Sequence, residues 1–351
     1  MRRLFSIIIA ATAALLITAG PALACGGLIG PNGAVNLLRT TTFAGYYDGV
    51  EHYVTSFEFA GGGGGAFGSL VPLPDVPTNV EKGGDWTLQR LVLETEPVRT
   101  LAFAAAQADG AERAEILIET RIDALDITVL RGGGAEVGAW ATENGFRLPP
   151  DAPEVLDFYA DRSPIFMAAV FDADAARERG QQVGDGTPVH LTIPTDDPWV
   201  PLRILGLGKG AAERVEADVY LLTDEEPRLL PGPEAEGLFL DHSAAATDLL
   251  LADLRSDTGM EWVPEEAWLT KLRIDAAAGD LAFDLAIDPT GTGTPSVVDA
   301  GFAPFGPAEA PPILPDLTPL FVMLVAIFGF TVATGLYVVT GGRGSPPLAG
   351  A

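Results

Sequence analysis

An uncharged stretch near the C-terminus constrains this chain more than any other feature. The 26 residues between Asp316 and Arg343 carry no charge, and they include the continuous apolar run from Leu320 to Phe328. An α-helix of about 20 residues is about 30 Å long, which matches the hydrocarbon core of a bilayer. The sequence therefore predicts a transmembrane helix over residues 317–340 and a short cytoplasmic tail over residues 341–351. A buried hairpin and a sortase-type signal are less favoured alternatives.

The N-terminal end has the pattern of an export signal. Two arginines precede an uncharged run of 16 residues from Leu4 to Ala19, which is too short to span a bilayer. The small residues of Ala22-Leu23-Ala24 are typical of a signal-peptidase site. The sequence therefore predicts a signal peptide over residues 1–24, cleaved between Ala24 and Cys25.

Cys25 is the only cysteine of the chain, and it would become the first residue after cleavage. This position makes Cys25 a candidate for lipidation, although the usual leucine three residues earlier is replaced by Ala22. Lipid attachment and ordinary cleavage are both left open. A single cysteine excludes an internal disulfide and a zinc site built from several cysteines.

An exported N-terminus followed by one span predicts a single-pass protein of the cell membrane, with an N-terminal ectodomain that is extracellular or periplasmic. Residues 25–316 hold all 48 Asp and Glu residues but only 18 Lys and Arg residues, so their formal charge is −30. This charge argues against nucleic-acid binding, which needs clustered basic side chains. It favours cations or basic proteins as partners.

Composition divides the exported region into two parts. Residues 289–316 are rich in Pro, Gly and Thr, which disfavours helices and central strands, so they are predicted to form a stalk. Residues 25–288 are predicted to fold as an α+β ectodomain with a largely antiparallel or mixed sheet, because expected strands outnumber helices and often follow one another directly. A weak similarity between residues 67–74 and 189–202 leaves two pseudo-repeats open.

Local patterns predict most elements of this ectodomain. A hairpin is expected from residues 35–43 and 52–59, and paired strands are expected from 115–122 and 125–130. Helices are expected over 85–94, 135–143, 153–159 and 243–254, with Asp85 and Asp151 as the N-caps of the first and third. Further strands are expected over 165–171, 189–193, 200–205, 216–222, 268–274 and 281–287.

Several segments of the ectodomain carry a family resemblance. They are Cys25-Gly26-Gly27, Phe67–Pro77, Gly84–Leu91, Trp140–Phe146 and Pro201-Leu202-Arg203-Ile204. Together they resemble an exported bacterial family with a C-terminal membrane span, catalogued as domain of unknown function 2330. The similarity covers most of residues 25–290. It implies an envelope protein of unassigned activity and transfers no catalytic residue to this chain.

The three histidines, His52, His190 and His242, are the first candidates for chemistry. His52 and His190 lie in expected strands without a second ligand at metal-binding spacing, so a structural role is favoured. Asp241-His242-Ser243 contains the residue types of a catalytic triad, but adjacent side chains point apart. The sequence therefore predicts no catalytic residue, no metal and no cofactor.

Other motifs match known sites poorly. Gly206–Gly210 lacks the first glycine and the final Ser/Thr of a phosphate-binding loop and is predicted to be a turn. The pairs Asp172/Asp174 and Asp196/Asp197 lack the twelve-residue pattern of a calcium loop. The glycines at 61–65 and the prolines at 72–77 suggest a binding edge beside an exposed Trp86, or simply a long loop next to an edge strand, which is favoured.

These observations predict a single-pass cell-envelope protein whose ectodomain binds or scaffolds another envelope component without catalysis. The expected partner is an envelope protein or polymer, in addition to the membrane itself. The alternative is an envelope hydrolase that acts on cell-wall polymer through acidic residues.

Overall fold

The computed structural model describes residues 27–30, 33–34, 40–57, 67–95, 114–172, 175, 178, 187–235 and 237–302. The chain divides into two units, residues 1–305 and 306–351, and all described residues belong to the first. The predicted signal peptide, the cleavage site at Ala24 and Cys25, the loop at 61–65 and the predicted transmembrane helix lie outside the described residues. No helix within the described ranges is both long and apolar enough to cross a membrane.

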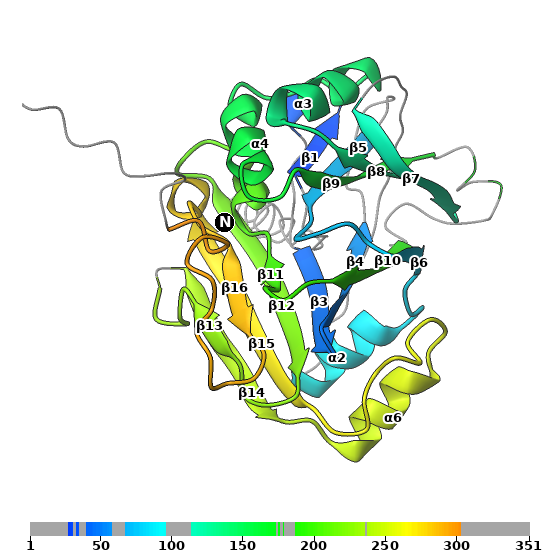
Figure 1. Ribbon diagram of the computed structural model, residues 1–351, viewed down its shortest axis with the longest axis vertical. Coiled ribbons are helices and arrows are strands. Elements are labelled where there is room, and N and C mark those ends of the chain that lie inside the picture. The colour runs from blue at the N-terminus through cyan, green and yellow to red at the C-terminus, as the bar shows by residue number, and fades with distance from the viewer. Residues whose placement is uncertain are drawn as a thin grey trace, which may run out of the picture. The chain divides into compact units, whose positions relative to one another are not determined.

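Two large β-sheets form the centre of the first unit (Figure 1). Sheet A contains β1 (Gly27–Gly30), β2 (Gly33–Ala34), β5 (Phe67–Pro72), β7 (Glu115–Ile122), β8 (Leu125–Arg131) and β9 (Ile165–Phe171), in the order β2-β1-β5-β9-β8-β7. Sheet B contains β3 (Thr40–Tyr47), β4 (Val50–Phe57), β6 (Asn79–Lys82), β10 (Thr187–Pro194), β12 (Arg214–Thr223), β14 (Leu238–Ala245) and β15 (Trp268–Ala277), in the order β14-β15-β12-β3-β4-β10-β6. A small third sheet contains β11 (Trp199–Val200), β13 (Arg228–Leu230) and β16 (Leu285–Asp288), in the order β11-β16-β13.

Helices cover the outer faces of the two large sheets. The helices α3 (Gly134–Glu143) and α4 (Ala152–Ala160) pack on sheet A, whereas α2 (Thr87–Thr95) and α6 (Asp248–Ser256) pack on sheet B. Two short 3-10 helices, η1 (Arg203–Gly206) and η2 (Ala278–Asp280), lie in the connections. The strands β3 and β12 pair in parallel, and the other strand pairs of the described chain are antiparallel. The predicted α+β class with a largely antiparallel or mixed sheet is confirmed.

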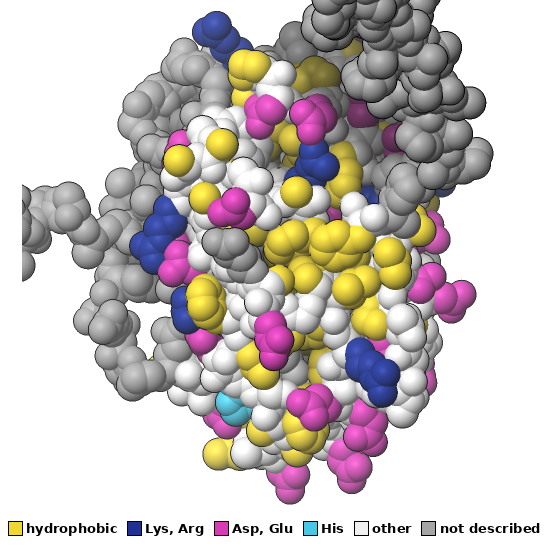
Figure 2. Space-filling model, turned by 90° about the vertical axis from the view of Figure 1, so that its left-hand side faces the viewer, with side chains coloured by type: hydrophobic (Ala, Val, Ile, Leu, Met, Phe, Trp, Pro, Cys, Tyr) yellow, Lys and Arg dark blue, Asp and Glu magenta, His cyan; other side chains and the backbone are white. Residues whose placement is uncertain are grey.

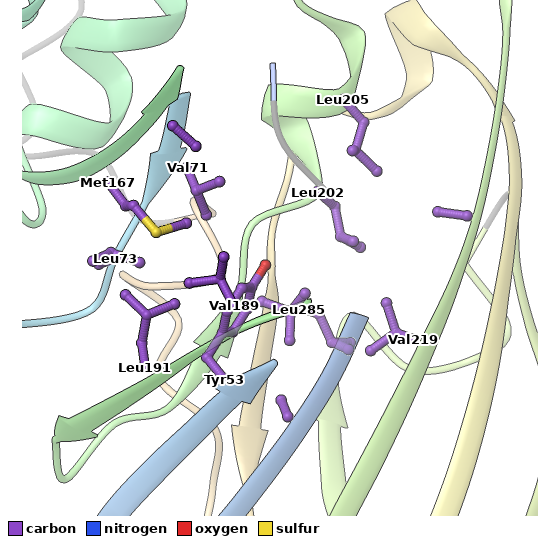
Figure 3. Packing of buried hydrophobic residues seen from close by; sticks show 14 of the residues in the cluster. Tyr53, Val71, Leu73, Met167, Val189, Leu191, Leu202, Leu205, Val219 and Leu285 are labelled. Atoms are coloured by element: carbon purple, nitrogen blue, oxygen red, sulfur yellow. The ribbon is translucent and has the colours of Figure 1, made fainter. Parts of the chain in front are cut away.

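The main core lies between the sheets (Figure 3). Tyr53, Val189 and Leu191 of sheet B meet Leu73 and Met167 from the side of sheet A, and all five are buried. Burial of such side chains stabilises the fold by roughly 1.5–3 kcal/mol each. Because alternate residues of a strand point to opposite faces, each central strand contributes to this core and to the layer under its helices.

Most of the predicted elements are present, with shifted ends. Two predictions are wrong. Residues 200–205 form the end of β11 and most of η1 instead of a strand, and Ser243–Ala245 belong to β14 instead of the helix predicted over 243–254. In the second case the backbone pairs with β15, opposite Trp268–Thr270, so pairing with a distant strand overrides the local helical pattern.

Asp151 occupies the predicted N-cap position of α4, whereas Asp85 lies two residues before the first residue of α2. Asp151 makes no capping hydrogen bond, and its carboxylate accepts one from the backbone N–H of Gly208 at 2.9 Å. At the start of α2, Asp257 replaces the predicted Asp85. Its carboxylate accepts hydrogen bonds from the backbone N–H groups of Asp85 and Trp86, at 3.1 and 2.9 Å. The cap therefore comes from a residue far along the chain, next to α6.

Residues 289–302, the first part of the predicted stalk, contain neither helix nor strand but pack on the rest of the first unit. The carboxylate of Asp288 accepts a hydrogen bond from the backbone N–H of Gly293 at 2.6 Å. Ala300 is fully buried, and Arg162 donates to the carbonyl of Asp299. The rest of the predicted stalk, residues 303–316, lies outside the described residues.

Candidate functional site

His52 of β4 and His190 of β10 meet on the outer face of sheet B. In the β4–β10 pair, His190 lies opposite Val54 and His52 lies opposite Thr192, so the two histidines are diagonal neighbours on one face. Nδ1 of His52 lies 3.0 Å from Nε2 of His190, which is a hydrogen-bond distance. The structure therefore brings together two histidines that the sequence treats separately.

The geometry of the pair fits a hydrogen bond rather than a shared metal ion. The ring centres lie 5.2 Å apart, close to the 3.0 Å between the nitrogens plus the distance from each nitrogen to its own ring centre. The two nitrogens therefore point at each other, whereas shared ligands would point at a third position between them. In the described part of the chain, no group of three or more His, Cys, Asp or Glu side chains is arranged to hold a metal.

Trp262 covers this histidine pair. Its indole ring stacks on His52, with ring centres 4.0 Å apart and an angle of 4° between the planes. The indole ring also contacts β3 at Gly45, where an added Cβ atom would overlap the ring. Glycine at this position therefore allows the indole to lie directly on the sheet.

Glu81 faces the other end of the pair. It lies opposite His190 in the β6–β10 pair, and its Oε1 is 3.4 Å from Nδ1 of His190. This distance exceeds that of an ordinary hydrogen bond, and Nδ1 makes no hydrogen bond within the described residues. His190 is 2% exposed, whereas the side chain of Glu81 is 47% exposed. The buried nitrogen therefore has a carboxylate across a short gap.

Both imidazoles are neutral near neutral pH. Burial lowers the pKa of His52 to about 4, with a smaller contribution from His190. Burial also lowers the pKa of His190 to about 4, and the negative charge of Glu261 opposes this effect in part. A neutral imidazole has one N–H donor and one acceptor nitrogen. Each ring can therefore donate a hydrogen bond from one nitrogen and accept a hydrogen bond at the other.

Glu51, which precedes His52 on β4, points to the opposite face of sheet B. It is fully buried, and neither carboxyl oxygen makes a hydrogen bond of ordinary geometry within the described residues. Burial raises the pKa of Glu51 to about 8, although the backbone amide of Trp199 lowers it in part. Glu51 is therefore protonated at neutral pH, and its buried position gives a ligand no access.

A second buried polar cluster is closed by its own hydrogen bonds. Oδ1 of Asp284 accepts from the hydroxyl of Tyr159 at 2.8 Å and from the backbone N–H groups of Leu202 and Arg203, at 2.7 and 3.0 Å. Its Oδ2 accepts from Arg162, and both charged side chains are fully buried. Since every strong acceptor position is used, this cluster holds α4, η1 and the segment before β16 together and offers no site for a ligand.

The residues of the triad-like motif are engaged separately. Asp241 forms an ion pair with Arg273 at 3.1 Å, and Oγ of Ser243 accepts a hydrogen bond from Nε1 of Trp268 at 2.8 Å. No hydrogen bond joins Asp241, His242 and Ser243 to one another within the described residues. Within the described residues, the three side chains are therefore not joined as a triad.

The remaining sequence motifs also have structural partners. Gly206–Gly210 is a turn, as predicted, and Lys209 forms an ion pair with Glu213 at 3.1 Å. Of the two aspartate pairs, the first includes Asp172, which forms an ion pair with Arg121. In the second pair, the pKa of Asp197 is raised by burial and by the charges of Asp299 and Asp196.

One turn exposes an unusual number of large hydrophobic side chains. Val297, Val298 and Phe302 are 48%, 44% and 50% exposed. They lie in a turn closed by a hydrogen bond of 3.1 Å from the N–H of Phe302 to the carbonyl of Val297, and Phe302 packs on Phe283 with ring centres 6.0 Å apart. We call residues 296–302 the C-terminal turn. Figure 2 shows hydrophobic side chains gathered on the face to which the segment 289–302 belongs, with Asp and Glu side chains around them.

Comparisons with known proteins identify a family but no activity. No curated protein matches the chain. One similar solved structure is a crystal structure of a mutated baculovirus P35 after caspase cleavage, with 6% sequence identity, 72% of this chain and 100% of that chain covered, and a TM-score of 0.37. A family model described as an uncharacterized protein conserved in bacteria (DUF2330) matches residues 23–288. The chain therefore belongs to this uncharacterized bacterial family.

Proposed function

We propose that the chain is a single-pass cell-envelope protein whose exported ectodomain binds another envelope protein without catalysis. The observation that supports this proposal is the C-terminal turn. Its three large hydrophobic side chains are each about half exposed, and contiguous exposed apolar groups with a polar rim are typical of protein-interaction surfaces. Phe302 packs on Phe283 and is half exposed, as is typical of an aromatic residue that contributes strongly to binding.

Charge narrows the class of partner. The exported region has a formal charge of −30, and Figure 2 shows Asp and Glu side chains around the hydrophobic groups, together with some Lys and Arg side chains. A basic protein with an apolar contact surface complements this arrangement, because opposite charges accelerate encounter while apolar contacts hold the complex.

The proposal also includes the location of the partner, which we expect in or near the same membrane. Residues 303–316 separate Phe302 from the predicted transmembrane helix. Fourteen residues reach at most roughly 45 Å when fully extended. This short chain length supports a partner in or near the same membrane.

Site-specific photocrosslinking in living cells tests this function. A photoreactive residue is placed at Val298 or Phe302 of the full-length protein, and the matched control places it at Leu249 on α6, which is 67% exposed. We expect the same protein adduct from positions 298 and 302 and its absence from position 249. Adducts with lipid alone, no adduct, or identical adducts from all three positions would contradict the proposal.

Membrane anchoring is tested separately by fractionation. The full-length protein is expected in the membrane fraction, and a variant that lacks residues 317–340 is expected in the soluble exported fraction. A full-length protein found in the soluble fraction would contradict the anchoring part of the proposal without bearing on the binding surface.

A further inference from the structure

The histidine pair is a second site, distinct from the C-terminal turn, and the direction of its hydrogen bond decides what the site can bind. Between two neutral imidazoles, either Nδ1 of His52 donates to Nε2 of His190, or Nε2 of His190 donates to Nδ1 of His52. In the first case the remaining nitrogen of His52, Nε2, carries a lone pair. In the second case it carries a proton. The two directions therefore present an acceptor or a donor to a ligand.

Glu81 selects between the two directions. If His190 donated through Nε2, its Nδ1 would carry a lone pair, buried and facing Oε1 of Glu81 at 3.4 Å. Two acceptors that face each other without a proton or water are unfavourable. If Nδ1 of His190 carries the proton, it is attracted to the carboxylate, and Nε2 is left as the acceptor for His52.

We propose that Glu81 fixes the hydrogen bonds of His190 and His52 in one direction, so that Nε2 of His52 is the accepting atom of a binding site for an uncharged, hydroxyl-bearing ligand. Glu81 is then a positioning residue, because it acts on the ligand only through the two histidines. His52 is partly exposed, and no hydrogen bond joins its Nε2 to a described residue.

The surroundings of His52 set the class of ligand. Thr192 lies opposite His52, and the exposed Asn79 lies opposite Thr192 on the neighbouring edge strand, so both share the face of His52. The indole of Trp262, which stacks on the imidazole of His52, supplies an apolar surface next to Nε2 of His52. An anion is disfavoured by Glu81 and by the formal charge of −30 on the exported region. A saccharide, which combines hydroxyl groups with apolar faces, fits these conditions.

Nitrogen NMR of the full-length protein in detergent tests the direction of the pair. With 15N-labelled histidine, we expect His190 and His52 both to carry their proton on Nδ1 near neutral pH, and Nε2 of both rings to be unprotonated. A proton on Nε2 of His190 would overturn the proposal. His242 lies on β14, away from this edge of sheet B, and its signal reports whether each variant keeps the fold.

Substitution of Glu81 tests its role as the selector. Glu81→Ala removes the carboxylate and is expected to give a mixture of the two tautomers at His190, with a matching change at His52. Glu81→Gln keeps an oxygen acceptor and is expected to retain the single tautomer. The matched control is Glu261→Ala, which removes a charge that acts on His190 only at a distance and is expected to leave the tautomers unchanged. Unchanged tautomers in Glu81→Ala would overturn the selection by Glu81.

Chemical modification tests whether Nε2 of His52 is available to a ligand. Diethylpyrocarbonate acylates unprotonated imidazole nitrogens, and mass spectrometry locates the product. We expect His52 to react several-fold faster than His190, which is 2% exposed. Sorbitol at high concentration, as a neutral hydroxyl donor, is expected to slow the reaction at His52. Sulfate is not expected to slow this reaction when it is compared with chloride at the same ionic strength. Faster reaction at His190, protection by sulfate, or protection by neither solute would overturn the proposed site.

Discussion

Glu51 and His52 are neighbours on β4, yet they belong to opposite layers of the molecule. Glu51 points into the core between the sheets, where its pKa rises to about 8. His52 points to the layer beneath Trp262, where its pKa falls to about 4. Burial is the largest cause in both cases, because desolvation disfavours the charged form of an acid and of a base alike. Two residues that would be charged in water near pH 5 are therefore both neutral in the fold.

The two layers differ in what the neutral group can do. Glu51 has no hydrogen bond of ordinary geometry and no access to solvent, so its neutral carboxyl is only a cost to the fold. His52 has a hydrogen bond, a stacked indole and partial exposure, so its neutral ring can serve a ligand. The comparison shows that burial creates a usable site only where the group also has a partner and a path to solvent.

The largest expected effect comes from Glu51→Gln. The folded pKa of Glu51 is about 8, above its unfolded value of 4.5, so the folded state binds the proton more tightly. The wild-type free energy of unfolding should therefore fall as the pH rises from about 4.5 to about 8, by at most about 5 kcal/mol. Glutamine cannot ionise, so Glu51→Gln should remove this fall and be the more stable protein at pH 8.

Urea unfolding of the first unit within the full chain, measured from pH 5 to pH 9, gives the result. Glu216→Gln is the control, because Glu216 lies on the same sheet but is only partly buried. Parallel pH profiles for wild type and Glu51→Gln would show that the carboxyl is not held neutral in the fold.

The second effect has the opposite direction in pH. The folded pKa of His190 is about 4, below its unfolded value of 6.5, so the unfolded state binds the proton more tightly. Stability should therefore fall as the pH drops from about 6.5 to about 4, by about 2–3 kcal/mol for this residue. His190→Gln should have a flatter profile in this range, although its stability at pH 7 is lower because the bond to His52 is weakened.

The measurement is best made in a Glu51→Gln background, because protonation of Glu51 would otherwise offset the acid effect. Urea unfolding between pH 7 and pH 4 compares Glu51→Gln with the double variant that also carries His190→Gln. An equally steep acid loss after the substitution would mean that His190 is already protonated in the fold, and the comparison between the two faces would fail.

The third test disturbs only the layer of His52. Gly45→Ala places a Cβ atom where the indole of Trp262 lies, so we expect Trp262 to move away from His52 at a cost of about 1–2 kcal/mol. Tryptophan fluorescence and thermal unfolding report the two changes. Gly210→Ala is the control, because a Cβ atom there meets nothing within 4 Å. Unchanged fluorescence in Gly45→Ala would show that the indole does not rest on β3.

The elements that the sequence predicts well are those with local causes. The β3–β4 hairpin follows from its turn, where Asp48 and Gly49 adopt positive φ angles of 51° and 77°, as expected for this turn chemistry. The helix α3 follows from the spacing of its buried residues Val137, Trp140 and Ala141, which recur at intervals of three and four. These causes lie within a few residues of the element that they form.

The site and the hydrogen bonds at the start of α2 could not be predicted because their partners lie far along the chain. Asp257 caps α2 from 172 residues away, and His52 and His190 are separated by 138 residues. The strand pattern around each histidine indicates a face of a strand, but only the strand order of sheet B places β4 beside β10 and β6 beside β10. Trp262 gives no local signal either, since its place on Gly45 depends on how the segment after α6 returns to the sheet.

The smallest expected effect tests the core face of β4 without any change in charge. Thr55 lies on the same face as Glu51, it is fully buried, and its hydroxyl makes no hydrogen bond within the described residues. Thr55→Val keeps the shape and removes the unpaired hydroxyl, so we expect thermal unfolding to show a gain of about 1 kcal/mol. Thr192→Val, on the half-exposed face of β10 next to His52, is expected to give almost no gain, because its hydroxyl is not desolvated to the same degree. A loss of stability in Thr55→Val would mean that the hydroxyl of Thr55 has a hydrogen-bond partner in the core. Buried polar groups on the core face of β4 would then have partners, as His52 has on the opposite face.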